Sequence, residues 1–369
     1  MTAPRVVVAG GHSAGHIEPM MNFADALCRM EPAAEITALG TVRGLDSMLI
    51  PARGYPLELI PPAPLPRRLN GALLRTPGRL RDSVRAAEAV LDRVRAEVVV
   101  GFGGYVAMPA YLAARRQGLP IVVHEANARP GVANRLAARM TTRVFTAAPS
   151  VRLAHAAAIG IPLRPAIIGL DRPALRDAAR QRFGLDPGGP VLMVTGGSQG
   201  AQTINAAVSG AAAALRAADV QVLHITGPRH AVEVPDGDPA DPPYVVAQYV
   251  DEMHSAYAAA DFVICRSGAM TCAELAAVGL PAAYVPLPLR GGEQRLNAEP
   301  VVEAGGGLLV DDADLEPAWI ETTLIPILVD PGRIAAMSAR ASATGAPDAG
   351  GVLARHVLTA VAERRRSAS

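Results

Sequence analysis

Short apolar runs rich in Val and Ile alternate along the chain with longer stretches rich in Ala and Leu. Continuous apolar runs are typical of buried parallel strands, and their alternation with helical stretches indicates βαβ units. We therefore predict an α/β fold with parallel sheets. The predicted strands are residues 6–9, 36–39, 98–100, 121–123 and 144–146 in the first half, and 191–194, 222–225, 245–247, 262–265 and 283–285 in the second.

The two halves of the chain open alike, each with an apolar run followed by a glycine-rich segment, at 10–15 and at 196–200. A strand, a glycine-rich turn and a helix in that order predict a Rossmann-like, doubly wound domain that binds its ligand at the carboxyl ends of its strands. The length of 369 residues fits two such domains. We predict an N-terminal domain, a C-terminal domain, and a C-terminal helix and tail that returns toward the first domain. Their predicted bounds are residues 1–165, 166–350 and 351–369.

The amino-acid composition excludes several classes of partner and mechanism. The 35 basic and 34 acidic residues leave a formal net charge of +1, which argues against a nucleic-acid partner. Every basic residue is Arg, so mechanisms that need a Schiff-base or P-loop lysine are excluded. The Asp-containing segment 235–243 has the composition of an exposed loop, and we predict no metal site. No stretch approaches the ~20 apolar residues of a membrane span, so any membrane contact is predicted to be peripheral.

In the first half, glycines and polar side chains follow three predicted strands. A glycine-rich turn lets the backbone approach a diphosphate, although a tight turn for packing is the alternative for each cluster. The imidazole of His16 can accept a proton near neutral pH, or can serve only at the helix entry. His124 and Glu125 either line the cleft or brace its loops, and Asn127 is the better candidate for a sugar contact. The candidates are Ser13, Gly15, His16, Gly103, Gly104, Tyr105, His124, Glu125 and Asn127.

The second half repeats this arrangement. Glu274 lies about one turn into a predicted helix, where a carboxylate can accept two hydrogen bonds from a ribose diol or can simply favour the helix dipole. The segment that follows residues 283–285 carries amides and a carboxylate suited to sugar hydroxyls. The candidates for donor binding are Gly197, Ser198, Gln199, Arg266, Ser267, Gly268, Glu274, Glu293, Gln294 and Asn297.

Six segments in order resemble the successive motifs of glycosyltransferase family 28, and together they cover nearly the whole chain. They are residues 15–19, 101–105, 124–131, 196–201, 266–271 and 293–298. The resemblance implies a GT-B fold, with two Rossmann-like domains facing a central cleft. It also implies an inverting, metal-independent hexosyltransferase of peptidoglycan synthesis. This enzyme moves N-acetylglucosamine from UDP-N-acetylglucosamine to the C4 hydroxyl of the muramyl sugar of lipid I, and the UDP-sugar is a substrate, with no cofactor.

The resemblance also assigns roles to residues. Ser198 and its neighbouring glycines would lie at the diphosphate, Glu274 at the ribose, and Gln294 with Glu293 at the sugar hydroxyls. Asn127 would reach the sugar from the first domain. His16 would be the base that deprotonates the attacking hydroxyl.

A lipid-linked acceptor requires a membrane surface. Residues 67–95 contain eight arginines against three acids, with leucines interspersed, which suits an anionic lipid surface and equally a solvated helix face. We predict a membrane face formed by Leu73, Leu74, Arg75, Arg79 and Arg81. The predicted location is the cytoplasmic face of the plasma membrane, and the predicted partners are the UDP-sugar, an undecaprenyl-linked acceptor and the anionic membrane, with cell-wall assembly proteins as further candidates.

The chain departs from the family pattern at several positions. Ser13 replaces a threonine, His12 occupies a glycine position, and Glu293 stands where many relatives have Gln. The interdomain motif appears only as residues 169–173, which leaves Arg172 as a displaced candidate for nucleotide contact. Three alternatives therefore remain: a related transferase of specialised metabolism with another acceptor, a UDP-sugar epimerase on the same fold, and an inactive scaffold.

Overall fold

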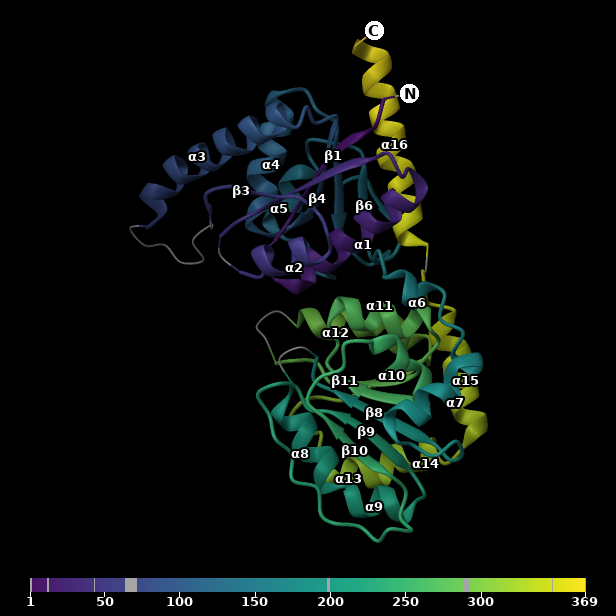
Figure 1. Ribbon diagram of the computed structural model, residues 1–369. Helices are drawn as coiled ribbons and strands as arrows, with labels where there is room; N and C mark the ends of the chain where they lie inside the picture. Colours follow the sequence, from purple (N-terminus) through teal and green to yellow (C-terminus); the bar gives the residue numbers. More distant parts are fainter. Residues whose placement is uncertain are drawn as a thin grey trace. The chain divides into compact units, whose positions relative to one another are not determined.

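The computed structural model describes residues 2–11, 13–42, 44–63, 72–197, 200–288, 292–346 and 348–368, with the backbone alone for 72–76 and 368. The chain divides into two compact units (Figure 1). Unit 1 is Met1–Arg164 with Pro347–Ser369, and unit 2 is Pro165–Ala346. Unit 1 ends at residue 164, one residue before the predicted end of the N-terminal domain at 165. The chain returns to unit 1 at residue 347, four residues before the predicted start of the C-terminal helix and tail at 351.

Unit 1 is built on a seven-stranded parallel sheet in the order β3-β2-β1-β4-β5-β6-β7. The chain runs from β1 outward to β3 and then returns to the other side of β1 with β4. This reversal creates a topological switch point between β1 and β4, where doubly wound sheets bind ligands. The strands are β1 Arg5–Gly10, β2 Glu35–Gly40, β3 Leu57–Leu59, β4 Val98–Gly103, β5 Ile121–Glu125, β6 Val144–Thr146 and β7 Ala156–Ala158.

Helices cover both faces of this sheet because successive residues of each buried strand point to opposite sides. Val7 and Val99 pack in the core formed with α3, α4 and α5, whereas Val6 and Val98 pack in the core formed with α1 and α16. The helices are α1 Ala14–Met30, α2 Asp46–Ala52, α3 Ala72–Arg93, α4 Gly104–Arg116, α5 Val132–Ala137 and α16 Ala349–Ala368.

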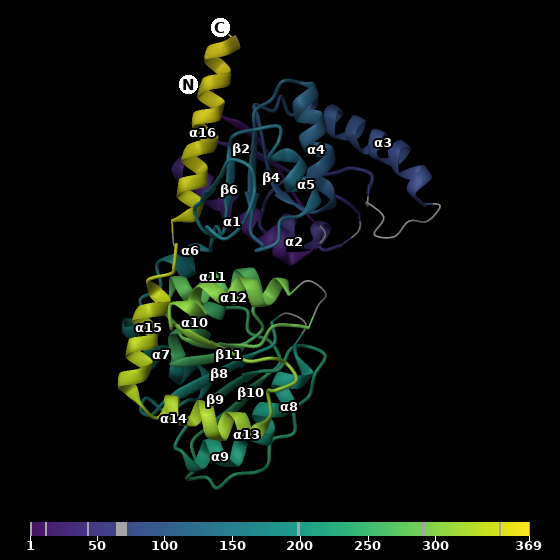
Figure 2. The same ribbon diagram turned by 180° about the vertical axis from the view of Figure 1, so that it is seen from behind.

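The C-terminal helix α16 belongs to the core of unit 1, although 182 residues of unit 2 precede its segment. It lies beside α1 and β6 (Figures 1 and 2). Leu353 and Val357 are fully buried in the core with α1, and His356 stacks on Phe145 of β6 at a centroid distance of 4.5 Å. Gly350 permits a close approach, because a Cβ there would lie 3.0 Å from Cβ of Ala26.

Unit 2 repeats the architecture with a six-stranded parallel sheet in the order β10-β9-β8-β11-β12-β13. Its switch point lies between β8 and β11. The strands are β8 Val191–Thr195, β9 Gln221–Ile225, β10 Tyr244–Ala247, β11 Phe262–Cys265, β12 Ala282–Tyr284 and β13 Gly307–Leu309. The helices are α6 Pro165–Ile168, α7 Arg172–Phe183, α8 Gln202–Gly210, α9 Ala212–Ala217, α10 Met253–Ala259, α11 Ala269–Ala277, α12 Glu293–Glu303, α13 Pro317–Trp319, η1 Ile320–Leu324, α14 Ile325–Leu328 and α15 Pro331–Ser342.

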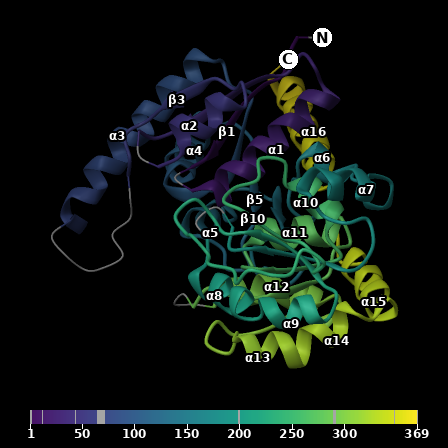
Figure 3. The same cartoon turned by 60° about the horizontal axis from the view of Figure 1, so that its bottom comes forward.

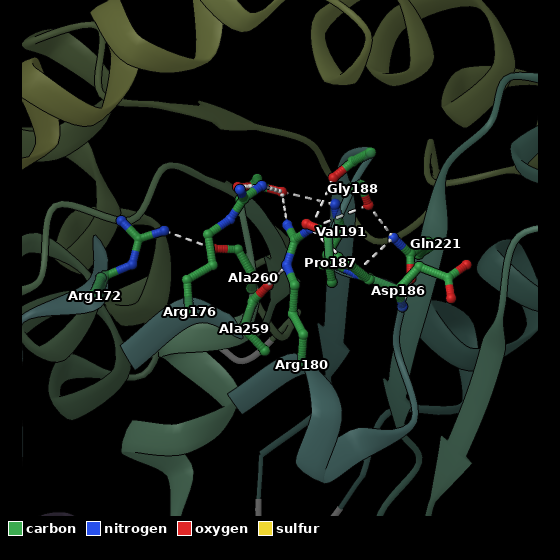
Figure 4. A network of polar contacts seen from close by, with 12 residues as sticks. Arg172, Arg176, Arg180, Asp186, Pro187, Gly188, Val191, Gln221, Ala259 and Ala260 are labelled. Carbon is green, nitrogen blue, oxygen red and sulfur yellow. Dashed lines mark hydrogen bonds and ion pairs between the residues drawn. The ribbon is translucent and has the colours of Figure 1, made fainter. Parts of the chain in front are cut away.

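One face of the second sheet packs against α8, α9, η1 and α14. Helices α8, α9 and α14 lie near one another in Figure 3. On this face Leu192 and Val194 of β8 contact the helices through residues such as Ile204 and Leu324. At the amino end of the sheet, the buried Arg180 of α7 reaches Asp261, which precedes β11 (Figure 4). These contacts fix the sheet and leave the carboxyl ends of β8 and β11 to carry the loops of the site.

All ten predicted strands are present, with shifts of one to three residues at some ends. The sequence interpretation missed β3, β7 and β13, which have three residues each. In the described part of the chain, no helix is long and apolar enough to cross a bilayer.

Candidate active site

The candidate residues of unit 1 gather at its topological switch point. Gly10 pairs with Gly103 where β1 and β4 end side by side. Gly103 and Gly104 have φ values of +88° and +81°, a region that favours glycine. A Cβ at Gly104 would lie 2.8 Å from the carbonyl oxygen of Gly11, so only glycine lets the two turns approach each other.

His16 lies in the first turn of α1, half-buried against these glycines. A Cβ at Gly103 would lie 3.3 Å from Cε1 of His16, and one at Gly104 would lie 3.4 Å from Cδ2. The absence of side chains at the end of β4 therefore makes the space that the imidazole occupies. This arrangement holds the imidazole of His16 at the carboxyl edge of the sheet.

The N-terminus of α1 is suited to an anion. Ser13 and Gly15 are exposed, and no acidic residue lies in the first turn. The first N–H groups of a helix carry partial positive charge and favour phosphate oxygens. The 17-residue α1 thus presents a candidate diphosphate site beside His16.

The glycine-rich turn of unit 2 follows β8 at the second switch point. A Cβ at Gly196 would lie 2.2 Å from the backbone nitrogen of Ala201, so the turn folds back tightly on itself. Gly197 is exposed and has a φ of +78°, and the position of its Cβ is open space. Its N–H donates to Oγ1 of Thr195 at 3.1 Å, and its carbonyl oxygen accepts from the backbone nitrogen of Gly200 at 2.9 Å. Ser198 and Gln199, which were predicted to bind the diphosphate, lie outside the described residues.

The neighbouring turn after β11 is held by the side chains of Asp312, which follows β13, and Asn297 of α12. Arg266 forms an ion pair with Asp312 and donates to the carbonyl oxygen of Val285 at 3.2 Å. Asn297 of α12 donates from Nδ2 to the carbonyl oxygen of Ser267 at 3.1 Å. Ser267 is fully buried, and its Oγ has no hydrogen-bond partner among the described residues. Asn297 thus holds the turn that contains Arg266 and Ser267, and this turn ends at Gly268, the N-cap of α11.

Glu274 lies in α11, half-buried, and its carboxylate is oriented by a tyrosine that the sequence analysis did not single out. The hydroxyl of Tyr257 donates to Oε2 of Glu274 at 2.8 Å. Burial, with the nearby Glu274 carboxylate, raises the pKa of Tyr257 well above its usual value, so this hydroxyl remains a donor. No sequence pattern marks Tyr257, because it lies in α10, 17 residues before its partner.

The segment between β12 and α12 adds the amide side chains. Oε1 of Gln294 accepts a hydrogen bond from the backbone nitrogen of Leu287 at 2.9 Å, which closes this loop onto the start of α12. Glu293 opens α12 and is half-buried beside it. His230 also reaches the carboxyl edge, since a Cβ at Gly200 would lie 2.4 Å from its imidazole. No motif in the sequence marks His230 as a candidate.

Comparisons with known proteins match both units. Residues 6–146 match the glycosyltransferase family 28 N-terminal domain, and residues 191–351 match the glycosyltransferase family 28 C-terminal domain. The chain belongs to glycosyltransferase family 28. The predicted resemblance is therefore confirmed, and so is the hexosyltransferase class that the family implies.

Full-length relatives within the family support the same assignment. A protein of Streptomyces avermitilis is 55% identical over 361 residues, with 98% of this chain and 99% of the relative covered. One of Mycolicibacterium smegmatis is 56% identical over 369 residues, with 99% and 96% covered. Both are named UDP-N-acetylglucosamine--N-acetylmuramyl-(pentapeptide) pyrophosphoryl-undecaprenol N-acetylglucosamine transferase.

Solved structures confirm the GT-B fold. The crystal structure of MurG from Acinetobacter baumannii matches with a TM-score of 0.79 at 23% identity and covers 97% of this chain and 99% of its own. The calicheamicin glycosyltransferase CalG4 matches with a TM-score of 0.61 at 18% identity, with 97% and 99% covered. At these identities the likeness concerns the fold alone.

Within this family 28 fold, two predicted cleft residues have a structural role instead. His124 and Glu125 are 0% and 1% exposed, so neither side chain lines a surface of unit 1. Nε2 of His124 lies 2.8 Å from the carbonyl oxygen of Gly160, and burial lowers the pKa of His124 to about 4, which keeps the ring neutral. The carboxylate of Glu125 accepts hydrogen bonds from the backbone nitrogens of Asn127 and Gly131, both at 3.0 Å.

The Glu125 network continues into the helices α5 and α4. Nδ2 of Asn134 donates to Oε2 of Glu125 at 3.0 Å, and the buried Tyr111 hydroxyl donates to Oδ1 of Asn134 at 2.7 Å. Burial raises the pKa of Glu125, and the hydrogen bonds oppose this shift. The network holds the loop that carries Asn127, which is half-buried at the carboxyl edge, as is Tyr105 at the start of α4.

Arg172 also differs from its prediction as a nucleotide contact. Its guanidinium donates to the carbonyl oxygens of Tyr257 and Gly279, both at 3.1 Å. It also donates to the carbonyl oxygen of Ala260 at 2.6 Å (Figure 4). Burial lowers the pKa of Arg172 to about 10, and the guanidinium remains charged at neutral pH. Because carbonyl groups of unit 2 already engage the side chain, we assign Arg172 to the packing of α7 in this family 28 domain.

Among the residues that the structure describes, no group of three or more His, Cys, Asp or Glu side chains is placed to hold a metal ion.

Proposed function

We propose that this chain transfers N-acetylglucosamine, with inversion, from UDP-N-acetylglucosamine to the C4 hydroxyl of the muramyl sugar of lipid I, and so forms lipid II. The observation that carries the proposal is the 55% identity over 98% of the chain with the Streptomyces avermitilis transferase. The site geometry supports it, because residues 15–16 and 103–104 gather at one switch point, and residues 196–197 and 266–268 gather at the other.

In the proposed reaction, unit 2 binds the donor. The backbone near Gly197 lies at the diphosphate, Glu274 accepts from the ribose hydroxyls, and Glu293 with Gln294 reads the sugar. The N-terminus of α11 at Gly268 favours the charge that develops on the departing UDP, so the proposal needs no metal ion or other cofactor.

Unit 1 supplies the acceptor side. The N-terminus of α1 favours the diphosphate of the lipid-linked acceptor, and His16 removes the proton from the attacking hydroxyl. Asn127 contacts the transferred sugar.

The test is single-turnover transfer from labelled UDP-N-acetylglucosamine to a short-chain lipid I analogue, with and without EDTA. UDP-glucose and an acceptor-free reaction are the controls. A disaccharide product that forms equally in EDTA supports the proposal. UDP binding without transfer to lipid I would contradict it and favour a family member with another acceptor.

The donor assignment gives a first prediction. Glu274→Ala is expected to weaken UDP binding about 10- to 100-fold, because hydrogen bonds to a charged group contribute about 1.5–3 kcal/mol. Tyr257→Phe removes only the hydroxyl that orients this carboxylate, and its loss should be smaller, about three- to tenfold. Isothermal titration with UDP measures both variants. Unchanged affinity in Glu274→Ala would remove the ribose assignment.

We further propose that α3 lies at the cytoplasmic face of the plasma membrane and binds anionic lipid. Arg79 and Arg81 are exposed on α3, which supports this. The side chains of Leu73, Leu74 and Arg75 lie outside the described residues. Cell-wall assembly proteins remain proposed partners.

Replacing Arg75, Arg79 and Arg81 by glutamine is expected to weaken binding to phosphatidylglycerol vesicles about fivefold for each arginine removed. Vesicle sedimentation measures the change.

The matched control replaces Arg29, Arg152 and Arg366, which are exposed elsewhere on unit 1, by glutamine. An equal loss in the two triple variants would mean that net charge alone governs binding and would contradict the assignment of α3.

A further inference from the structure

A cavity of about 690 Å³ opens in unit 1 at the edge of the sheet opposite to the candidate active site. Its walls are residues 118–121 before β5, residues 139–143 before β6, and residues 360–367 near the end of α16. Because the strands are parallel, these amino ends lie at the far edge from His16 and the glycine turns. The cavity is therefore separate from the site described above.

Positive charge dominates the lining. It includes Arg115, Arg139, Arg143 and Arg364, with Glu363 as the acid. Arg143 forms an ion pair with Glu363, which leaves three arginines without a countercharge from the lining.

The guanidinium groups of Arg115, Arg139 and Arg364 make no hydrogen bond or ion pair with any residue that the structure describes. Nη1 of Arg364 is also shielded from solvent. A buried donor without a partner is unfavourable, and buried charges are normally paired. Together with the exposed Arg115 and Arg139, Arg364 gives the wall of the cavity a positive charge that no described residue neutralises.

The other lining residues have the polar and apolar groups that suit a small phosphorylated ligand. The exposed Thr142 adds a hydroxyl, while Leu119, Ile121 and Met140 supply apolar wall. The volume lies within the range of about 300–1,000 Å³ that is usual for small-molecule sites. Guanidinium groups match phosphate oxygens in geometry and charge.

We propose that this cavity binds the phosphate groups of a small anionic ligand, either a free di- or polyphosphate or the headgroup of an anionic lipid. The ligand bridges α16 to the loops before β5 and β6. Since α16 completes the core of unit 1, occupancy stabilises that unit.

The test uses the full chain with saturating UDP, which occupies the donor site. Inorganic pyrophosphate and ADP probe the free-ligand source, and phosphatidylglycerol vesicles probe the lipid source. The cavity variant combines Arg139→Ala with Arg364→Ala. The control combines Arg152→Ala with Arg366→Ala. It also replaces one loop arginine and one α16 arginine, but both lie outside the cavity.

We expect a free phosphate probe or the vesicles to bind the native chain and the control pair alike, and to bind the cavity variant at least tenfold more weakly. A free ligand at ten times its Kd should raise the melting temperature by about 3 °C. Without ligand, Arg364→Met should leave the melting temperature unchanged or higher, since it removes an unpartnered donor. Transfer to lipid I should be unchanged in every variant.

The proposal would be overturned if pyrophosphate, ADP and the vesicles all failed to bind at millimolar phosphate. It would also be overturned if the cavity variant and the control pair lost phosphate binding equally. A third contrary result is that polyglutamate binds and no phosphate probe does. The last result would put an acidic protein segment in the cavity. Because lipid I transfer is measured separately, failure here is distinguishable from failure of the proposed function.

Discussion

Replacing His16 by alanine is expected to lower kcat for transfer to lipid I by about 100- to 10,000-fold, with little change in KM for the donor. The imidazole is held against Gly103 and Gly104 at the carboxyl edge of unit 1, where the acceptor hydroxyl would lie in the proposed reaction. Its removal takes away the proposed base, whereas the proposed donor contacts in unit 2 stay intact.

Steady-state and single-turnover kinetics measure this variant, and thermal unfolding checks that it folds. His16→Gln is the matched variant, because glutamine retains polar bulk but accepts no proton near neutral pH. Both variants should lose activity alike if His16 is the base. Rescue by glutamine, or a KM that rises as much as kcat falls, would instead give His16 a positioning role.

The fold was predictable where burial imposes long apolar runs. Strands such as β1 and β8 are buried on both faces, so nearly every residue must be apolar. The missed strands β3, β7 and β13 have three residues each. Glu58 interrupts β3, whereas β13 is apolar but begins in a glycine run at 305–307. In β7 the sequence is Ala-Ala-Ala and all three residues are exposed, so only pairing with β6 defines it as a strand.

The site was predictable in position but not in the role of each residue. Glycine turns after strands indicate the switch points, because the carboxyl ends of parallel strands meet at one edge. Burial depends on partners that sequence alone does not reveal. His124 contacts the carbonyl oxygen of Gly160, 36 residues away, and Arg172 contacts carbonyl groups 85 to 107 residues away. Such distant partners give His124 and Arg172 structural contacts. Glu125 is held by partners only 2 to 9 residues away, so for His124 and Glu125 the structure favours the bracing role that the sequence left open.

An ion pair with a fully buried arginine lies at the amino end of the sheet of unit 2. Arg180 is 0% exposed, and its Nη2 donates to Oδ2 of Asp261 at 2.7 Å (Figure 4). Nη1 donates to the carbonyl oxygens of Pro187 at 2.8 Å and Gly189 at 3.0 Å. Asp261 also accepts from the backbone nitrogen of Val191 at 2.8 Å, so the pair joins α7 to the starts of β8 and β11.

Asp261→Ala is therefore expected to destabilise unit 2 by about 3–5 kcal/mol, because it leaves the Arg180 guanidinium buried without its countercharge. Burial lowers the pKa of Arg180 and Asp261 opposes this shift, but the guanidinium stays charged at neutral pH and cannot escape the cost by deprotonation. For a domain of this size the melting temperature should fall by about 6 to 20 °C. Thermal unfolding without UDP measures the loss.

Arg176→Met is the matched control, since Arg176 contacts the same carboxylate at 3.3 Å with a side chain that is 40% exposed. An exposed ion pair contributes at most about 1 kcal/mol, so this variant should melt within a few degrees of the native chain. Asp261→Ala combined with Arg180→Met removes both charges and should recover part of the stability. If Asp261→Ala melted no lower than Arg176→Met, the buried pair would not be what holds α7 to the sheet.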